Sequence, residues 1–192
     1  YSAKKGLIPR EEFFRKFNFD PAKKLILYVS TGGDCCDETD YLFLLKKYME
    51  TGALKETQVL IRPHLKYAGD RERFHSFEKH PNFAVDATDI QNESLRDNWD
   101  ISERHTMNLC NSLVHAAVCI NIGSTIMLDA AACGTPSINI NFDIQKNISP
   151  HRSTKRLFLS DYIQAAVRTG GTRVVESENE FLSALMEILS CG

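Results

Sequence analysis

A short turn of small polar residues is the clearest place for chemistry in this sequence. Gly123, Ser124 and Thr125 follow an apolar run, and the pattern after them predicts a helix that begins at Thr125. Such a turn brings main-chain N–H groups and two hydroxyls to the positive end of a helix dipole, an arrangement suited to phosphate. Asp129 falls one turn later, where a carboxylate can accept hydrogen bonds from ribose hydroxyls. The alternative is that Ser124 or Thr125 only caps the helix while Asp129 complements its dipole.

A second candidate is the tripeptide Arg62-Pro63-His64, at the end of a predicted strand. Proline cannot continue a central ladder, so Pro63 fixes the exit of the strand. Arg62 and His64 then project near the same edge of the sheet, where an imidazole can donate to a phosphate or carry a proton. A histidine by itself is more often structural or simply exposed, so this prediction depends on what lies beside it.

A third candidate is the glycine pair Gly32 and Gly33, which follows the first predicted strand. Glycine allows a ligand to approach the main chain closely, although tight turns after strands often need glycine anyway. Neither GxGxxG nor GxxxxGK[ST] occurs in the chain. A nicotinamide site of the Rossmann type and a P-loop nucleotidase are therefore disfavoured.

A fourth candidate is a short basic run after the fifth predicted strand. It could neutralise a diphosphate or an acidic partner, and the alternative is a solvated loop that binds nothing. Its basic residues are His151, Arg152, Lys155 and Arg156.

Metal and disulfide chemistry are not expected. The other histidines show no HExxH or zinc-ligand spacing, so we predict no metal site. The six cysteines include an adjacent pair, Cys35 and Cys36, but no CxxC motif, and three of them, Cys110, Cys119 and Cys133, lie in apolar or helical segments. This usage is typical of free thiols in an intracellular protein.

The elements that position these candidates alternate between strands and helices. A capping box at Ser177 and Glu180 announces the last helix. Residues 1–22 are expected to form a linker or a short helix that packs back on a domain spanning residues 23–192. Strands are expected over residues 24–30, 57–62, 82–86, 117–121, 136–140 and 172–176, and helices over 41–49, 70–79, 125–132 and 157–167, with further helices from Glu103 and after Ser177.

Six apolar strands alternating with amphipathic helices predict an α/β fold. The expected architecture is a doubly wound, six-stranded, mainly parallel sheet of the Rossmann-like kind. Such sheets bind ligands at the carboxyl ends of their strands, near the point where the strand order switches. Each candidate described above follows a strand or opens the next helix, so this edge is where they are expected to meet.

Composition excludes several classes of protein. The 192 residues are 43% hydrophobic and 25% charged, which excludes a disordered or fibrous chain. A net charge of −2 argues against a protein that coats nucleic acid. No apolar stretch approaches the ~20 residues of a membrane span. The chain opens without a signal peptide and without Met, so we expect a soluble cytoplasmic protein and a piece of a longer one.

Taken together, the chain resembles the C-terminal, donor-binding half of a GT-B glycosyltransferase. The similarity is to bacterial surface-carbohydrate and capsule-type enzymes, including those similar to glycerophosphotransferases. It covers most of the chain from about Lys24. The motifs that carry it are Leu60-Ile-Arg-Pro-His64, Gly123-Ser-Thr125, Leu128-Asp-Ala-Ala-Ala132, Gly134-Thr-Pro136 and Gly170-Gly171.

The resemblance implies a nucleotide-activated donor, UDP-, CDP- or CMP-linked, in a cleft between two Rossmann-like domains. His64, Ser124 and Thr125 would contact the donor phosphates, and Asp129 would replace the carboxylate, often Glu, that holds the ribose. Such enzymes need no metal or other cofactor at the phosphates, because dipoles, hydroxyls and basic side chains stabilise the leaving diphosphate. The N-terminal acceptor-binding domain, which supplies the general base in many relatives, is missing. We therefore expect donor binding without turnover and assign no catalytic residue.

Two other functions remain as alternatives. Non-hydrolysing sugar-nucleotide epimerases share the architecture, but they usually carry a Ser-Gly-Gly signature and acidic pairs where this chain has Gly-Ser-Thr and Asp129. A non-catalytic nucleotide-binding or regulatory module with a degenerate pocket need not keep all the candidate site residues, and the presence of His64, Ser124, Thr125 and Asp129 counts against it.

Overall fold

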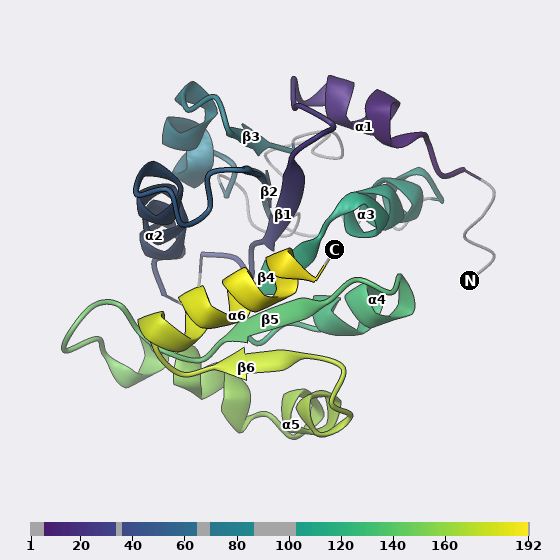
Figure 1. Ribbon diagram of the computed structural model, residues 1–192. Helices are drawn as coiled ribbons and strands as arrows, with labels where there is room; N and C mark the ends of the chain where they lie inside the picture. The colour runs from purple at the N-terminus through teal and green to yellow at the C-terminus, as the bar shows by residue number, and fades with distance from the viewer. Residues whose placement is uncertain (1–5, 34–35, 65–69, 87–102, 192) are drawn as a thin grey trace.

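The computed structural model describes residues 6–33, 36–64, 70–86 and 103–191. Over these residues the chain forms a six-stranded sheet in the order β3-β2-β1-β4-β5-β6 (Figure 1). Every neighbouring pair is parallel. The strands are β1 (Lys24–Val29), β2 (Thr57–Arg62), β3 (Phe83–Val85), β4 (Val118–Asn121), β5 (Ser137–Ile140) and β6 (Arg173–Val175).

Helices cover both faces of this sheet, so the predicted doubly wound α/β fold is confirmed (Figure 1). They are α1 (Arg10–Lys16), α2 (Thr39–Glu50), α3 (Glu103–His115), α4 (Ile126–Ala132), α5 (Asp161–Arg168) and α6 (Glu178–Ser190), with 3₁₀-helices η1 (Glu72–Lys79), η2 (Pro150–Arg152) and η3 (Thr154–Leu159). In the described part of the chain no helix has both the length and the apolar character that crossing a membrane requires.

The strands are buried on both faces because successive side chains of β1 enter different cores. Ile26 and Tyr28 pack in the core formed with α2, η1 and α6. Leu25 and Leu27 pack in the opposite core, formed with α1, α3 and α4. This is why the strand reads as a continuous apolar run rather than as an alternation.

The N-terminal helix α1 is part of the domain. Phe13 and Phe14 are buried in the second core, and the Arg10 guanidinium lies over the Phe14 ring at 4.1 Å from its centroid. The same guanidinium donates to the carbonyl oxygens of Pro21 and Lys23. Of the two expectations for this segment, a helix that packs back on the domain is the one observed, and the boundary after residue 22 stays a prediction.

One predicted helix is wrong as a single element. The segment expected as a helix over 157–167 is divided at Ser160, whose main chain is extended (φ −73°, ψ 129°). The N–H of Ser160 donates to the Leu157 carbonyl and ends η3, while its own carbonyl accepts from Gln164 and begins α5.

The predicted cap of the last helix, α6, is confirmed, because the Ser177 hydroxyl accepts from the N–H of Glu180 at 3.2 Å.

Candidate functional site

The turns after β1, β2 and β4 lie side by side at the carboxyl edge of the sheet. Val29 is the register partner of Arg62, and the N–H of Ser30 donates to the Arg62 carbonyl at 2.9 Å. On the other side, the Thr31 hydroxyl donates to the Ile122 carbonyl at 2.8 Å. From β1 the chain adds β2 and β3 on one side of the sheet, and it then crosses to the other side of β1 to add β4, β5 and β6. Ligands of doubly wound sheets bind at such a switch point, which here lies between β1 and β4.

The glycine turn after β1 has the shape that its residues predict. Gly32 has a φ of +97°, a conformation that favours glycine. Its N–H donates to the Ser30 hydroxyl at 3.0 Å. Gly33 follows it and is exposed at the edge.

A buried carboxyl group beneath this turn was not predicted from the sequence. Glu38 is fully buried, and its two oxygens accept from the Ser30 hydroxyl at 2.6 Å and from the N–H of Thr31 at 2.9 Å. Burial raises the pKa of Glu38 to about 7, although these hydrogen bonds act in the opposite direction. A glutamate at the start of an amphipathic helix is also typical of an exposed first turn, so the sequence carried little signal for this role.

The residues after β2 divide into a buried ion pair and a histidine at the edge. The Arg62 guanidinium lies 2.6 Å from the Asp86 carboxylate, and Arg62 is only 5% exposed. His64 is partly exposed, and its main-chain N–H donates to the Asp70 carboxylate at 2.7 Å. Arg62 thus already has a carboxylate partner, and its predicted contact with phosphate stays a prediction.

The turn after β4 differs from the expected array of open main-chain donors. The N–H of Gly123 donates to the Asn139 side-chain oxygen at 3.1 Å, and that of Ser124 to the Asn121 side-chain oxygen at 3.3 Å. Thr125 precedes α4, is exposed, and makes no capping hydrogen bond with its side chain. The turn therefore presents the Thr125 hydroxyl at the surface, and the alternative in which Thr125 serves as a side-chain cap is not observed.

The basic segment after β5 is held against this turn. The Asp143 carboxylate accepts from the Ser153 hydroxyl at 2.6 Å and from the N–H of Thr154 at 2.8 Å. Gly123 is so close to this segment that a Cβ placed on it would lie 2.7 Å from the Cβ of Leu157. The four predicted basic side chains are exposed here: His151, Arg152, Lys155 and Arg156.

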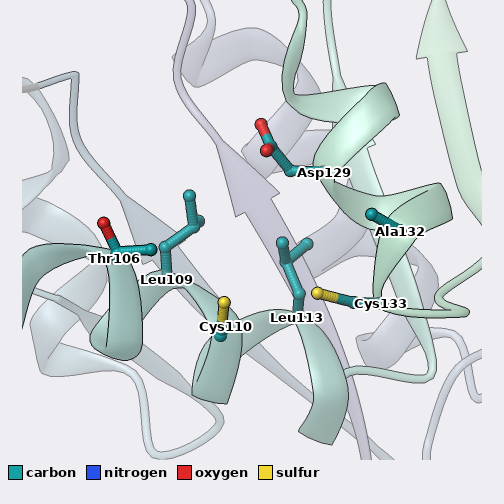
Figure 2. Close-up of a pocket in the computed structure, with 7 residues that line it drawn as sticks. All are labelled: Thr106, Leu109, Cys110, Leu113, Asp129, Ala132 and Cys133. Atoms are coloured by element: carbon teal, nitrogen blue, oxygen red, sulfur yellow. The ribbon is translucent and has the colours of Figure 1, made fainter. Parts of the chain in front are cut away.

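Asp129 lies in a pocket between α3 and α4. Figure 2 shows the Asp129 side chain at one end of this pocket and the thiols of Cys110 and Cys133 at the other end. Burial raises the pKa of Asp129. Its predicted contact with a ribose stays a prediction. The remaining lining residues are Thr106, Leu109, Leu113 and Ala132.

The cysteines of the described segments are free thiols. Burial raises the pKa of Cys119 to about 12 and that of Cys133 to about 11, so both are protonated at neutral pH. Within the described ranges, no three His, Cys, Asp or Glu side chains are grouped to hold a metal ion.

Unpaired polar atoms gather near the same edge of the sheet. Among the described residues, the buried side-chain atoms without a hydrogen-bond partner are Asn121 Nδ2, Asn141 Oδ1 and Thr154 Oγ1. Asn121 ends β4, Asn141 follows β5, and Thr154 belongs to the segment that Asp143 anchors. Since a buried polar atom without a partner costs about 1–3 kcal/mol, these atoms favour a polar ligand or ordered water at this edge.

Comparisons with known proteins find similarity in structure alone. No protein-family model and no curated protein sequence matches the chain. The ADP-heptose lipopolysaccharide heptosyltransferase II of Escherichia coli superposes with a TM-score of 0.56 at 12% identity, over 95% of this chain and 51% of that one. A UDP-GlcNAc 2-epimerase from Neisseria meningitidis, solved with UDP-GlcNAc bound, superposes with a TM-score of 0.56 at 10% identity, over 94% of this chain and 40% of that one.

The fold is accordingly a Rossmann-like domain of the GT-B type, as found in glycosyltransferases and sugar-nucleotide epimerases. The chain spans about half the length of the heptosyltransferase and less of the epimerase.

Proposed function

We propose that this chain is the donor-binding domain of a GT-B glycosyltransferase. The enzyme would move a sugar or a polyol phosphate from a nucleotide-activated donor to a surface-carbohydrate acceptor. The observation that carries the proposal is the meeting of the glycine turn, His64, the Gly123–Thr125 turn and the basic segment at one edge of the sheet. An additional acceptor-binding domain completes the active site in this proposal.

The donor diphosphate occupies the edge between β1 and β4. The exposed Thr125 hydroxyl and the partly exposed His64 supply hydrogen bonds to it. The basic residues Arg152, Lys155 and Arg156 supply positive charge where negative charge develops on the leaving diphosphate, and His151 of the same segment supplies a further hydrogen-bonding side chain.

The ribose lies beside α4. Thr125 and Asp129 are four residues apart, with Thr125 already in the helical region of φ and ψ, so the two side chains share one face of the helix. A nucleotide whose phosphate contacts Thr125 therefore extends naturally toward Asp129. The carboxylate accepts hydrogen bonds from the ribose hydroxyls, and the apolar pocket wall beside it faces the rest of the nucleoside.

A sugar-nucleotide epimerase domain is the second candidate. The Neisseria epimerase superposes as well as the heptosyltransferase does, with the same TM-score of 0.56. The single Asp129 in a Gly-Ser-Thr context favours the transferase. Incubation of the full-length parent with the donor distinguishes them, because an epimerase converts the sugar without an acceptor and a transferase requires one.

A thermal-shift panel tests the proposed donor binding. UDP, CDP, CMP, GDP and ADP are each added to the domain, with and without EDTA, since a ligand of the native state raises the melting temperature. We expect one nucleotide class to raise the melting temperature and EDTA to leave that rise unchanged. No rise with any nucleotide, for this chain and for the full-length parent, contradicts the proposal.

A further inference from the structure

A network of charged side chains lies beneath the glycine turn. The Glu38 carboxylate accepts from the Ser30 hydroxyl and from the N–H of Thr31, and the Tyr28 hydroxyl lies 3.5 Å from one of its oxygens. Both oxygens of Glu38 are thus directed at β1 and at the turn that follows it. Ser30 in turn accepts from the N–H of Gly32, so the carboxylate supports the turn through two residues.

Arg73 extends this network to the neighbouring strand. Its guanidinium lies 3.5 Å from the Glu38 carboxylate and 2.5 Å from the Asp70 carboxylate. Asp70 also accepts from the main-chain N–H of His64 at 2.7 Å. A Cβ placed on Gly33 would lie 3.7 Å from the Arg73 guanidinium, so the cation lies beside the far end of the turn.

We propose that Glu38 is a positioning residue whose ionised carboxylate fixes the Ser30–Gly33 turn and, through Arg73 and Asp70, the main chain at His64, in the arrangement that receives the donor phosphates. This inference rests on the proposed function. It adds a regulatory property to it, because donor binding then depends on the ionisation of a group that does not touch the donor.

The hydrogen bonds show why the charge matters. A carboxylate is an acceptor only, which suits a site where a hydroxyl, an amide and a guanidinium all point at its oxygens. A protonated carboxyl group would direct its own O–H at one of these donors. Arg73 favours the charged form of Glu38, whereas Asp70 and above all burial oppose it, so the pKa rises to about 7. Further titratable groups around the site are Tyr28 of β1, Tyr41 of α2, and Cys36 and Asp37, which precede α2.

The first test needs no ligand. Amide NMR resonances of Thr31, Gly32 and Gly33 are followed from about pH 5.5 to pH 8.5 in the wild type, Glu38→Gln and Asp40→Asn. Gln keeps an oxygen that can accept from Thr31, and Asp40 is a carboxylate two residues away that bonds to Gln145 instead. We expect one shared transition near neutral pH at the three amides, lost in Glu38→Gln and kept in Asp40→Asn. A transition at Gly33 that persists in Glu38→Gln, or none at Thr31 in the wild type, overturns the proposal.

The second test measures nucleotide affinity against pH in the wild type and Glu38→Gln. We expect the wild-type affinity to fall about tenfold, ~1.4 kcal/mol, as the pH drops below neutral, and the variant to lose this dependence. Both proteins keep His64 and titrate the same nucleotide, so the difference between the profiles reports Glu38. Identical profiles overturn the positioning role and leave the proposed function standing. If the wild type binds no nucleotide at any pH, the proposed function fails, and the amide transitions still decide the role of Glu38.

Discussion

Gly123 lies directly against Leu157, so closely that a Cβ on the glycine would come within 2.7 Å of the leucine Cβ. The glycine also has a φ of +50°, in the left-handed region. The turn after β4 and the basic segment after β5 therefore fit together only because this residue has no side chain.

Replacement of Gly123 by alanine is expected to destabilise the domain by about 2–5 kcal/mol. The left-handed conformation costs an L-residue about 1–2 kcal/mol, and overpacking against Leu157 adds about 1–3 kcal/mol. Gly52→Ala is the matched control, because Gly52 has a φ of +86° but a Cβ placed on it would meet nothing within 4 Å. Urea unfolding measures both variants. Equal destabilisation of the two would show that the contact with Leu157 does not matter.

The ion pair between Arg62 and Asp86 is expected to stabilise the fold. Arg62→Met leaves Asp86 buried without this partner, so unfolding should become easier by about 3–5 kcal/mol. The double variant Arg62→Met with Asp86→Leu should recover most of that loss, as measured by urea unfolding. A single variant that stays as stable as the wild type but binds nucleotide more weakly would instead support the phosphate contact predicted for Arg62.

Asp129→Asn is expected to weaken ribonucleotide binding without lowering the stability of the fold. Burial raises the pKa of Asp129, so removing its charge should leave the free energy of unfolding unchanged or slightly higher. A ribose hydroxyl bonded to the carboxylate would be held less well, and ribonucleotide affinity should fall about tenfold, ~1.4 kcal/mol. Calorimetry with ribonucleotides and their 2′-deoxy forms checks this, since the variant should also discriminate less between the two sugars. Unchanged affinity and discrimination would exclude the ribose contact.

The raised pKa of Glu38 predicts how stability varies with pH. The pKa is about 7 in the fold against an ordinary value of 4.5, so the folded protein binds the extra proton between these values. The stabilisation by the protonated form is fully present below about pH 4.5 and is lost as the pH rises through about 7. Relative to Glu38→Gln, the wild type should therefore lose about 3 kcal/mol of unfolding free energy across this window. If the free energy of unfolding varied with pH in the same way in both proteins, the raised pKa of Glu38 would be contradicted.

The order of strands and helices was predictable from the sequence because buried parallel strands read as apolar runs between amphipathic segments. The candidate motifs were also predictable to the extent that they follow those strands. Ser160 shows the limit of this approach, since the periodicity runs through it while its extended main chain divides η3 from α5. Local pattern does not reveal where the main-chain hydrogen bonds change partner.

Long-range contacts decide the parts of the site that the sequence did not predict. Asn139 lies on the strand beside the Gly123 turn, and its side-chain oxygen accepts from the Gly123 N–H. A main-chain donor that the sequence predicted to be free for a phosphate is therefore already bonded. The sequence predicts Arg62 as a phosphate ligand but does not predict its ion pair with Asp86, which is 24 residues away. Glu38 depends on Arg73, which comes from η1 and is 35 residues away in sequence.

Calorimetric titration of the nucleotide identified by the thermal-shift panel tests the central claim most directly. It compares the wild type with Ser124→Ala/Thr125→Ala and with the control pair Thr51→Ala/Ser190→Ala, whose exposed hydroxyls lie at the far ends of α2 and α6. We predict at least about tenfold weaker binding, ~1.4 kcal/mol, for the first pair alone, with unchanged melting temperature in the absence of ligand. Equal affinity for all three proteins would contradict a donor site at the turn after β4.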